Sequence, residues 1–234
     1  MQLEVLADSD MVAQRGATVI AKEARDAVAV RGRFLIGVSG GKTPWIMLRA
    51  LAGEKNVPWD VVHFFQVDER VAPEGHRDRN LTQLRESLLE HAPIRPEQIH
   101  AMPVEAPDLE AAAKSYAGIL EEIAGVPPVL DLVHLGLGPD GHTASLVPLD
   151  PVLDVKDVDV GLTGVYQQRR RMTLTYPIIN RARRILWLVT GSEKADPLAR
   201  LVEGDVSIPA GRVHQDHATV LADRAAAGSL RVAS

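Results

Sequence analysis

One stretch of the sequence places an acid and a base two residues apart, directly after a run of apolar residues and glycines. Residues 131–148 read DLVHLGLGPDGHTASLVP, with Asp140 and His142 in the turn that follows the apolar run. A carboxylate beside an imidazole can orient the ring and hold the tautomer that accepts a proton, as a general base requires. We therefore predict that Asp140 and His142 are catalytic; the alternative is a loop histidine whose ring is hydrogen-bonded to the backbone.

A second turn has the properties of an anion site. Residues 37–44 read GVSGGKTP and lie between an apolar strand, 34–38, and a helix for which Thr43 would be the N-cap and Pro44 the first residue. Backbone N–H groups, hydroxyls and an ammonium group at a helix N-terminus suit a phosphate. An ordinary strand-to-helix turn is the alternative. The predicted phosphate-binding residues are Ser39, Gly40, Gly41, Lys42 and Thr43.

Three charged residues follow other apolar runs. Asp68 and Arg70 come after residues 61–67, and Lys194 stands in the first turn of a helix that follows residues 185–190. A cation is unfavourable at a helix N-terminus unless an anion lies nearby. We therefore predict that Lys194 binds a ligand phosphate, although a solvated lysine also fits. Asp68 and Arg70 are predicted to bind substrate; for Arg70 the alternative is an internal ion pair.

Apolar strands alternate with helical patterns along the chain, which predicts an α/β fold with a mostly parallel sheet. Ligands of such sheets bind at the carboxyl ends of strands, and that edge would collect Ser39, Asp68, His142 and Lys194. No linker or repeat divides the sequence, so we expect one domain over residues 1–234. The expected strands are 3–6, 34–38, 61–67, 99–102, 130–135, 185–190 and 218–221. The expected helices are 10–30, 45–52, 81–91 capped by Asn80, 109–124, a helix ending at 202, and a last alanine-rich helix capped by Asp223.

Composition narrows the class of protein. The 234 residues are 46% hydrophobic and 24% charged, without a long apolar run, so we expect a soluble protein with no membrane partner. The absence of cysteine excludes disulfides, thiolate nucleophiles and cysteine-ligated metals. The net charge of −5 and the 4% aromatic content argue against a nucleic-acid partner. The first residues lack the pattern of a secretory signal, and cytoplasmic localisation is the expectation.

Three motif matches are incomplete. The glycines of residues 136–141 fit a dinucleotide fingerprint, but Asp140 would repel a pyrophosphate and Pro148 leaves little room for the helix that the motif needs. Residues 37–41 fit the nucleophile elbow of serine hydrolases, although too few strands precede it; a serine mechanism stays possible. Residues 37–43 are one residue short of a P-loop, which argues against nucleoside triphosphates.

Taken together, the motifs resemble those of the glucosamine-6-phosphate isomerase/6-phosphogluconolactonase family. The resemblance implies a Rossmann-like three-layer α/β/α domain, similar to the glucosamine-6-phosphate deaminase and ribose-5-phosphate isomerase fold group. It also implies hydrolysis of 6-phospho-D-glucono-1,5-lactone in the pentose phosphate pathway, with no metal and no organic cofactor. The matching segments are GVSGGKTP (37–44), VDERVAPEGHRDRN (67–80), HLGLGPDGHTASLVP (134–148), RMTLTYPIINRA (171–182) and VTGSEKA (189–195).

By this resemblance His142 is the general base and Asp140 its partner, while sugar phosphate is bound at Ser39, Gly40, Gly41, Arg70 and Lys194. One departure is that Val147-Pro148-Leu149 stands where the family has Phe-Pro-Gly, which bears on the shape of the loop. A deaminase on the same fold is the nearest rival, but that family continues from Asp-Gly-His to Asn-Glu-Pro, and residues 143–148 contain no Glu. A sugar-phosphate sensor is the rival of another class, and it would need no base. Monomers and small homo-oligomers both remain compatible with the sequence.

Overall fold

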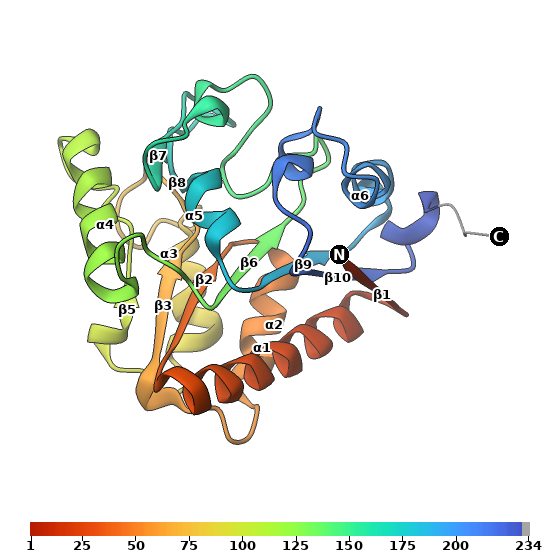
Figure 1. Cartoon of the computed structure of the whole chain (residues 1–234), viewed down its shortest axis with the longest axis horizontal. Helices are drawn as coiled ribbons and strands as arrows, with labels where there is room; N and C mark the ends of the chain where they lie inside the picture. Colours follow the sequence, from red (N-terminus) through yellow and green to blue (C-terminus); the bar gives the residue numbers. More distant parts are fainter. Residues whose placement is uncertain (231–234) are drawn as a thin grey trace.

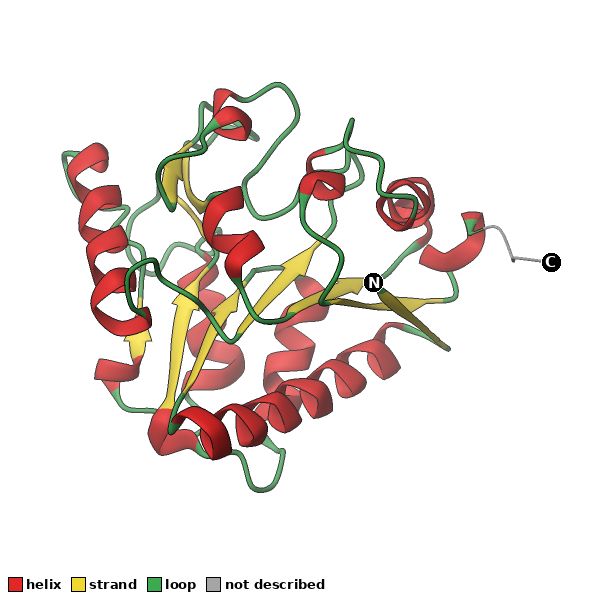
Figure 2. Cartoon of the chain, viewed as in Figure 1, coloured by secondary structure: helices red, strands yellow, loops and turns green. Residues whose placement is uncertain are grey.

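The computed structural model describes residues 1–230, and a seven-stranded sheet runs through its centre (Figure 1, Figure 2). The spatial order is β1-β10-β9-β6-β2-β3-β5, and every neighbouring pair in it is parallel. The expectation of a mostly parallel α/β fold is therefore confirmed. The strands of this sheet are β1 (Gln2–Leu6), β2 (Phe34–Val38), β3 (Val62–Gln66), β5 (Ile99–His100), β6 (Leu132–Gly136), β9 (Ile185–Val189) and β10 (Ala218–Asp223).

Helices cover both faces of the sheet, with α1 and α2 on one side and α4, α5 and α6 on the other (Figure 1). The α-helices are α1 (Ser9–Arg31), α2 (Lys42–Ala52), α3 (Asn80–Leu84), α4 (Leu109–Ala124), α5 (Tyr176–Arg181) and α6 (Ala195–Val202), and a π-helical turn, Arg85–Leu89, continues α3. Short 3-10 helices lie at Trp59–Val61, Pro96–Gln98, Pro151–Asp154, Ser192–Lys194, Pro209–Arg212 and Ala226–Ser229.

Alternation along the strands explains the two apolar layers. In β2, Phe34 and Ile36 pack with α1 and α2, whereas Leu35 belongs to the cluster that includes α4. All five residues of β2 are buried. A strand covered on both faces reads as a continuous apolar run, which is why β2, β6 and β9 could be predicted from sequence.

A second, three-stranded antiparallel sheet stands above the carboxyl edge of the first, in the order β4-β8-β7. Its strands are β4 (Asp68–Arg70), β7 (Val160–Leu162) and β8 (Arg171–Leu174). Because β4 follows β3 after a single residue, this sheet is tied to the main one. The register places Arg70 opposite Arg171, which brings two guanidinium groups from distant parts of the sequence together.

The start of α2 differs from the expectation. The helix begins at Lys42 with Gly41 as N-cap, so the prediction of Thr43 as N-cap and Pro44 as first residue is wrong. Gly41 has a φ of 129°, which a residue with a Cβ rarely adopts, and this glycine turns the chain into the helix two residues earlier than expected. Pro44 is still tolerated, because the first helical N–H groups have no partner within the helix.

Two other expected helices are also corrected. Asn80 is the first residue of α3 rather than its cap, because the buried carboxylate of Glu69 accepts hydrogen bonds from the backbone N–H groups of Asn80 and Leu81 at 2.8 and 2.9 Å. This frees the Asn80 side chain for other contacts. Within residues 1–230, the expected last helix is only the 3-10 turn Ala226–Ser229, although Asp223 does accept a hydrogen bond from the Ala226 N–H at 2.7 Å.

Candidate active site

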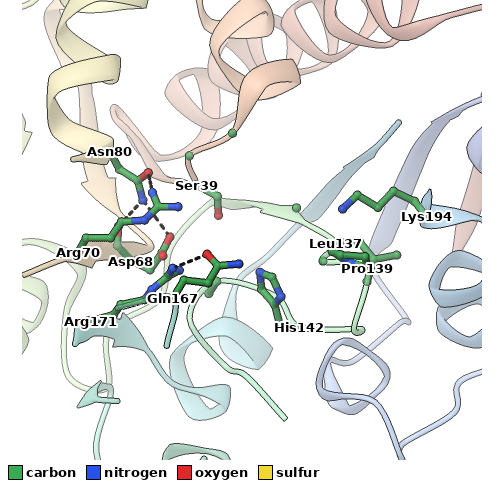
Figure 3. A pocket seen from close by; sticks show the side chains of 15 residues that line it. Ser39, Asp68, Arg70, Asn80, Leu137, Pro139, His142, Gln167, Arg171 and Lys194 are labelled. Carbon is green, nitrogen blue, oxygen red and sulfur yellow. Dashed lines mark hydrogen bonds between the residues drawn. The ribbon is translucent and has the colours of Figure 1, made fainter. Parts of the chain in front are cut away.

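A cavity of about 260 Å³ opens at the carboxyl edge of the main sheet, between the ends of β2 and β6 (Figure 3). These two strands are neighbours, but the chain proceeds outward from them in opposite directions, to β3 and β5 on one side and to β9 and β10 on the other. Such a switch point leaves a crevice where ligands of open α/β sheets bind. The cavity is lined by Ser39, Gly40, Gly41, Asp68, Arg70, Asn80, Gly136, Leu137, Gly138, Pro139, His142, Ala144, Gln167, Arg171 and Lys194.

Asp140 and His142 form a hydrogen-bonded pair at this cavity. Asp140 Oδ1 lies 2.5 Å from His142 Nδ1 and also accepts a bond from the backbone N–H of His142 at 3.2 Å. Partial burial opposes ionisation of Asp140, but the attraction of His142 and the hydrogen bonds that the carboxylate accepts hold its pKa below the usual range. An ionised Asp140 keeps the proton on Nδ1, which leaves Nε2 as the nitrogen that can accept one.

Glycines make this turn possible. Gly141 has a φ of 81°, in the left-handed region, and a Cβ on Gly138 would lie 2.0 Å from His142 Nδ1. The backbone N–H of Gly138 donates to the carbonyl of His142 at 2.8 Å, so the turn closes on itself. The Asp140–His142 pair therefore packs directly against the backbone of Gly138, which no residue with a side chain at position 138 would permit.

The turn after β2 presents backbone donors to the cavity. Among the hydrogen bonds of residues 1–230, the N–H groups of Gly40 and Gly41 have no acceptor. Gly40 packs so closely on Asn80 that an added Cβ would lie within 2.0 Å of its side chain, at 1.9 Å from Oδ1. These two amides, at the N-terminus of α2, are suited to an anion.

Ser39 lines the cavity, but within residues 1–230 its hydroxyl is not hydrogen-bonded to a base. Its hydroxyl donates to the backbone carbonyl of His134 at 2.9 Å, and its N–H points to His134 Nδ1 at 3.3 Å. A serine nucleophile needs an imidazole or another base as acceptor of its own hydroxyl proton. The arrangement of Ser39 therefore argues against the serine-hydrolase interpretation.

The other two residues of that predicted set lie elsewhere. Lys42 is exposed and is not among the residues that line the cavity. Thr43 is buried, and its hydroxyl is hydrogen-bonded to that of Thr190 at 2.7 Å. Thr43 thus ties α2 to the end of β9, and the structure does not bring either side chain to the cavity.

Asp68 and Arg70 lie on one wall, linked through Asn80. The Arg70 guanidinium donates to Asn80 Oδ1, and Asn80 Nδ2 donates to Asp68 Oδ1 at 3.2 Å. The second oxygen of Asp68 accepts a bond from Ser145 Oγ at 2.7 Å, and the carboxylate is only 4% exposed. Figure 3 shows the side chains of Asp68, Arg70 and Asn80 grouped together. Both oxygens of Asp68 are thus hydrogen-bonded within this wall.

Arg171 is a cavity residue that the sequence did not reveal. It is 3% exposed, donates from Nη2 to Gln167 Oε1 at 3.0 Å, and has no partner for Nε among the described residues. Burial, together with the nearby Arg70, lowers the pKa of Arg171. In the sequence it is the third of three consecutive arginines and looks like part of a solvated basic turn. Only its pairing with β4 turns it inward.

Lys194 approaches from the other side of the cavity, with His142 between it and the two arginines (Figure 3). It ends the 3-10 helix Ser192–Lys194 and serves as N-cap residue of α6. Burial lowers its pKa, and the carboxylates of Glu193 and Asp140 oppose that effect. A partly buried ammonium group facing a cavity is matched to an anionic ligand.

Residues 147–149, where the sequence has Val-Pro-Leu in place of the family's Phe-Pro-Gly, still contain a residue in a turn conformation. Val147 is buried, whereas Leu149 is 99% exposed and has a φ of 66°, a conformation that favours glycine. The loop therefore retains a left-handed residue even though glycine is absent.

Two negative findings apply to residues 1–230. Within them, no group of three or more His, Cys, Asp or Glu side chains is arranged to hold a metal ion. No helix in the same part of the chain is long and apolar enough to cross a membrane.

Fold and cavity define a class: a Rossmann-like α/β protein with a carboxylate–imidazole pair and basic side chains at the switch point of its sheet. The family model for "Glucosamine-6-phosphate isomerases/6-phosphogluconolactonase" matches residues 7–222. The chain belongs to this family.

Individual relatives agree with this placement. The chain is 38% identical to a 6-phosphogluconolactonase of Mycobacterium tuberculosis, over 97% of this chain and 98% of the relative. Its structure resembles that of a 6-phosphogluconolactonase from Thermotoga maritima, with a TM-score of 0.83, 28% identity and coverage of 95% and 98% of the two chains. A monomeric glucosamine-6-phosphate deaminase has the same fold, with a TM-score of 0.86 at 20% identity over 98% of this chain and 100% of that one.

Proposed function

We propose that this chain hydrolyses 6-phospho-D-glucono-1,5-lactone to 6-phospho-D-gluconate in the oxidative pentose phosphate pathway. The observation that carries the proposal is the hydrogen-bonded Asp140–His142 pair, which stands in a cavity between Lys194 on one side and Arg70 and Arg171 on the other. Enzymatic hydrolysis of a phosphorylated lactone calls for a base that activates water and for cations that bind the phosphate. The names of the relatives with more than a third of their residues identical support the same substrate.

In the mechanism that we propose, His142 Nε2 takes a proton from a water molecule, which attacks the lactone carbonyl carbon. Asp140 holds the proton on Nδ1 and stabilises the imidazolium that forms. The resulting oxyanion is stabilised by backbone amides near the cavity and by Arg70. His142 then returns the proton to the ring oxygen as the bond from the carbonyl carbon to that oxygen breaks.

In this proposal the phosphate group of the substrate positions the lactone carbonyl next to His142. The candidate groups are Lys194 and the Ser39–Gly41 turn, in which the N–H groups of Gly40 and Gly41 have no acceptor within residues 1–230. Binding energy from a remote phosphate holds the carbonyl near the base, which replaces a collision in solution by a reaction within the complex. Lys42 and Thr43 lie outside the lining of the cavity, so in this proposal they support the turn.

We further propose that residues 1–234 act as one domain in the cytoplasm, as a monomer or a small homo-oligomer, without metal or organic cofactor. The partner is the small sugar-phosphate lactone, with no nucleic acid and no membrane. Treatment with a chelator tests whether the activity is independent of metal. Lactonase activity is expected to be unchanged, and a loss of activity that added metal restores would contradict the proposal.

The deciding experiment is a coupled assay with freshly generated 6-phosphogluconolactone, run beside glucosamine 6-phosphate. The rate with the lactone is expected to exceed spontaneous hydrolysis and to rise in proportion to the amount of protein. Release of ammonia from glucosamine 6-phosphate, without acceleration of lactone hydrolysis, would favour the deaminase. Binding of both compounds without turnover would favour a sugar-phosphate sensor.

A further inference from the structure

The Asp140–His142 pair is contacted by a side chain from another part of the chain. The hydroxyl of Tyr166 donates to Asp140 Oδ2 at 3.0 Å, and its ring meets the His142 ring edge-on, with centroids 5.5 Å apart. Tyr166 lies in the hairpin between β7 and β8 and is not among the residues that line the cavity. We propose that Tyr166 is a positioning residue, which fixes the Asp140 carboxylate and thereby aims His142 at the substrate. This inference rests on the proposed lactonase function.

The carboxylate needs a second anchor. Both bonds from Asp140 to His142, to the ring Nδ1 and to the backbone N–H, use the same oxygen, Oδ1. The Asp140 side chain is 35% exposed, so with Oδ2 unbound the group could rotate and exchange its bond to the ring for bonds to water. The Tyr166 hydroxyl donates to Oδ2, so that each oxygen of the carboxylate has a protein partner.

The hairpin holds Tyr166 in place. Its backbone N–H donates to the Arg169 carbonyl at 2.9 Å, and Gln167 and Gln168 close the turn with φ values of 49° and 67°. The Arg171 guanidinium carbon lies 5.0 Å from the centroid of the Tyr166 ring, a cation–π contact. The phenol therefore stands between a substrate-cavity arginine and the dyad, and its backbone has little freedom.

The protonation of the Tyr166 hydroxyl also suits it to donate a hydrogen bond to Asp140. Partial burial, followed by the hydrogen bond and charge of Asp140, raises the pKa of the phenol. The hydroxyl is therefore protonated near neutral pH, where the proposed mechanism uses an ionised Asp140. A charge-assisted bond of this kind also moderates the attraction of Asp140 for a protonated His142.

The test is Tyr166→Phe, which removes the hydroxyl and keeps the ring against His142 and Arg171. The matched control is Val165→Ala, its neighbour in the hairpin, whose side chain is 73% exposed. We expect kcat for the phosphorylated lactone to fall about tenfold, the cost of one charge-assisted hydrogen bond, with KM unchanged. We also expect the acidic limb of the pH–kcat profile to move to higher pH, since an Asp140 carboxylate that has lost the Tyr166 hydrogen bond attracts the imidazolium more strongly. The control should match the wild type in all three quantities.

Each outcome is informative. If wild-type protein shows no lactonase activity, the proposed function fails before this inference is reached. If wild-type protein is active and Tyr166→Phe equals it in kcat and pH profile, the positioning role is wrong. A loss confined to KM would mean that the hydroxyl binds substrate. A drop in melting temperature with an unshifted pH profile would assign Tyr166 a structural role only, and would equally overturn the inference.

Discussion

At the scale of single residues, the proposed mechanism assigns proton transfer and anion binding to different side chains of the cavity. Asp140 and His142 hold each other through a 2.5 Å contact, while Arg171 and Lys194 are partly or fully buried cations with lowered pKa values. Buried cations at a cavity favour an anionic ligand, because the charge of the ligand offsets the cost of removing the cations from water. The base and the cations can therefore be tested separately.

Replacement of the base should affect turnover and leave binding intact. For His142→Ala we expect kcat, corrected for the spontaneous hydrolysis of the lactone, to fall by a factor of about 10² to 10⁴, which is the usual contribution of a general base. Binding of 6-phosphogluconate, measured by calorimetry, should persist because the cations remain. His214→Ala, at an exposed histidine, is the control. Full activity of His142→Ala would exclude the proposed mechanism.

Replacement of a cation should affect recognition of the phosphate. Lys194→Ala is expected to raise KM for the phosphorylated lactone about tenfold or more, as for loss of one charge-assisted bond, and to leave gluconolactone nearly unaffected. Lys42→Ala is the matched comparison, because Lys42 is exposed and does not line the cavity. Equal effects of Lys194→Ala on both substrates would remove Lys194 from the phosphate site.

At the scale of elements, the junction of β4 and α3 depends on the carboxylate of Glu69. This group is 0% exposed, binds the N–H groups that begin α3, and pairs with Arg79 Nε at 3.1 Å. It also accepts a bond from the backbone N–H of Arg70 at 2.8 Å. A buried charge thus connects the start of a helix to the strand that carries a cavity arginine.

Glu69→Gln should destabilise the fold strongly, because it leaves Arg79 buried and poorly paired. We expect the free energy of unfolding to fall by about 3 to 5 kcal/mol, the usual cost of breaking a buried ion pair. Glu105→Gln is the control, since Glu105 pairs with the same arginine from a position that is 47% exposed; its cost should be about 1 kcal/mol or less. Urea titration measures both, and similar values for the two variants would contradict this account.

At the scale of the whole molecule, histidines buried as neutral groups make stability depend on pH. Burial lowers the pKa of His134 to about 3, and burial together with the neighbouring His63 lowers that of His100 to about 4. In the unfolded chain a histidine has its ordinary pKa of about 6.5, so between pH 6.5 and 4 the unfolded state binds more protons than the folded state. Stability is therefore expected to fall as the pH is lowered through this range.

The measurement is urea unfolding at several pH values between 7 and 4. His100→Phe, which keeps an aromatic ring against Phe65, should show a shallower fall in stability over this range. The control is a change at the exposed His91, which should retain the wild-type slope. A wild-type stability that is constant from pH 7 to pH 5 would contradict the assignment of neutral buried histidines.

Much of this architecture follows from local patterns that the sequence displays directly. The apolar runs of β2, β6 and β9, the long helices α1 and α4, and the glycine turn with Asp140 and His142 depend on neighbours a few residues apart. Periodicity, helix capping and glycine conformations act over that range, so these features could be predicted. The site roles of these residues remain predictions until the variants are measured.

The tertiary structure decided which polar residues reach the cavity. Arg171 enters because β8 pairs with β4 and sets it opposite Arg70, and Tyr166 meets Asp140 because the same sheet carries its hairpin over the turn. Lys42 belongs to a promising turn, yet it is exposed outside the cavity. The strand register joins Arg70 to Arg171 across about a hundred positions, and the hairpin joins Tyr166 to Asp140 across 26 positions. The energies of these contacts come from strand pairing and burial, which no local pattern in the sequence records.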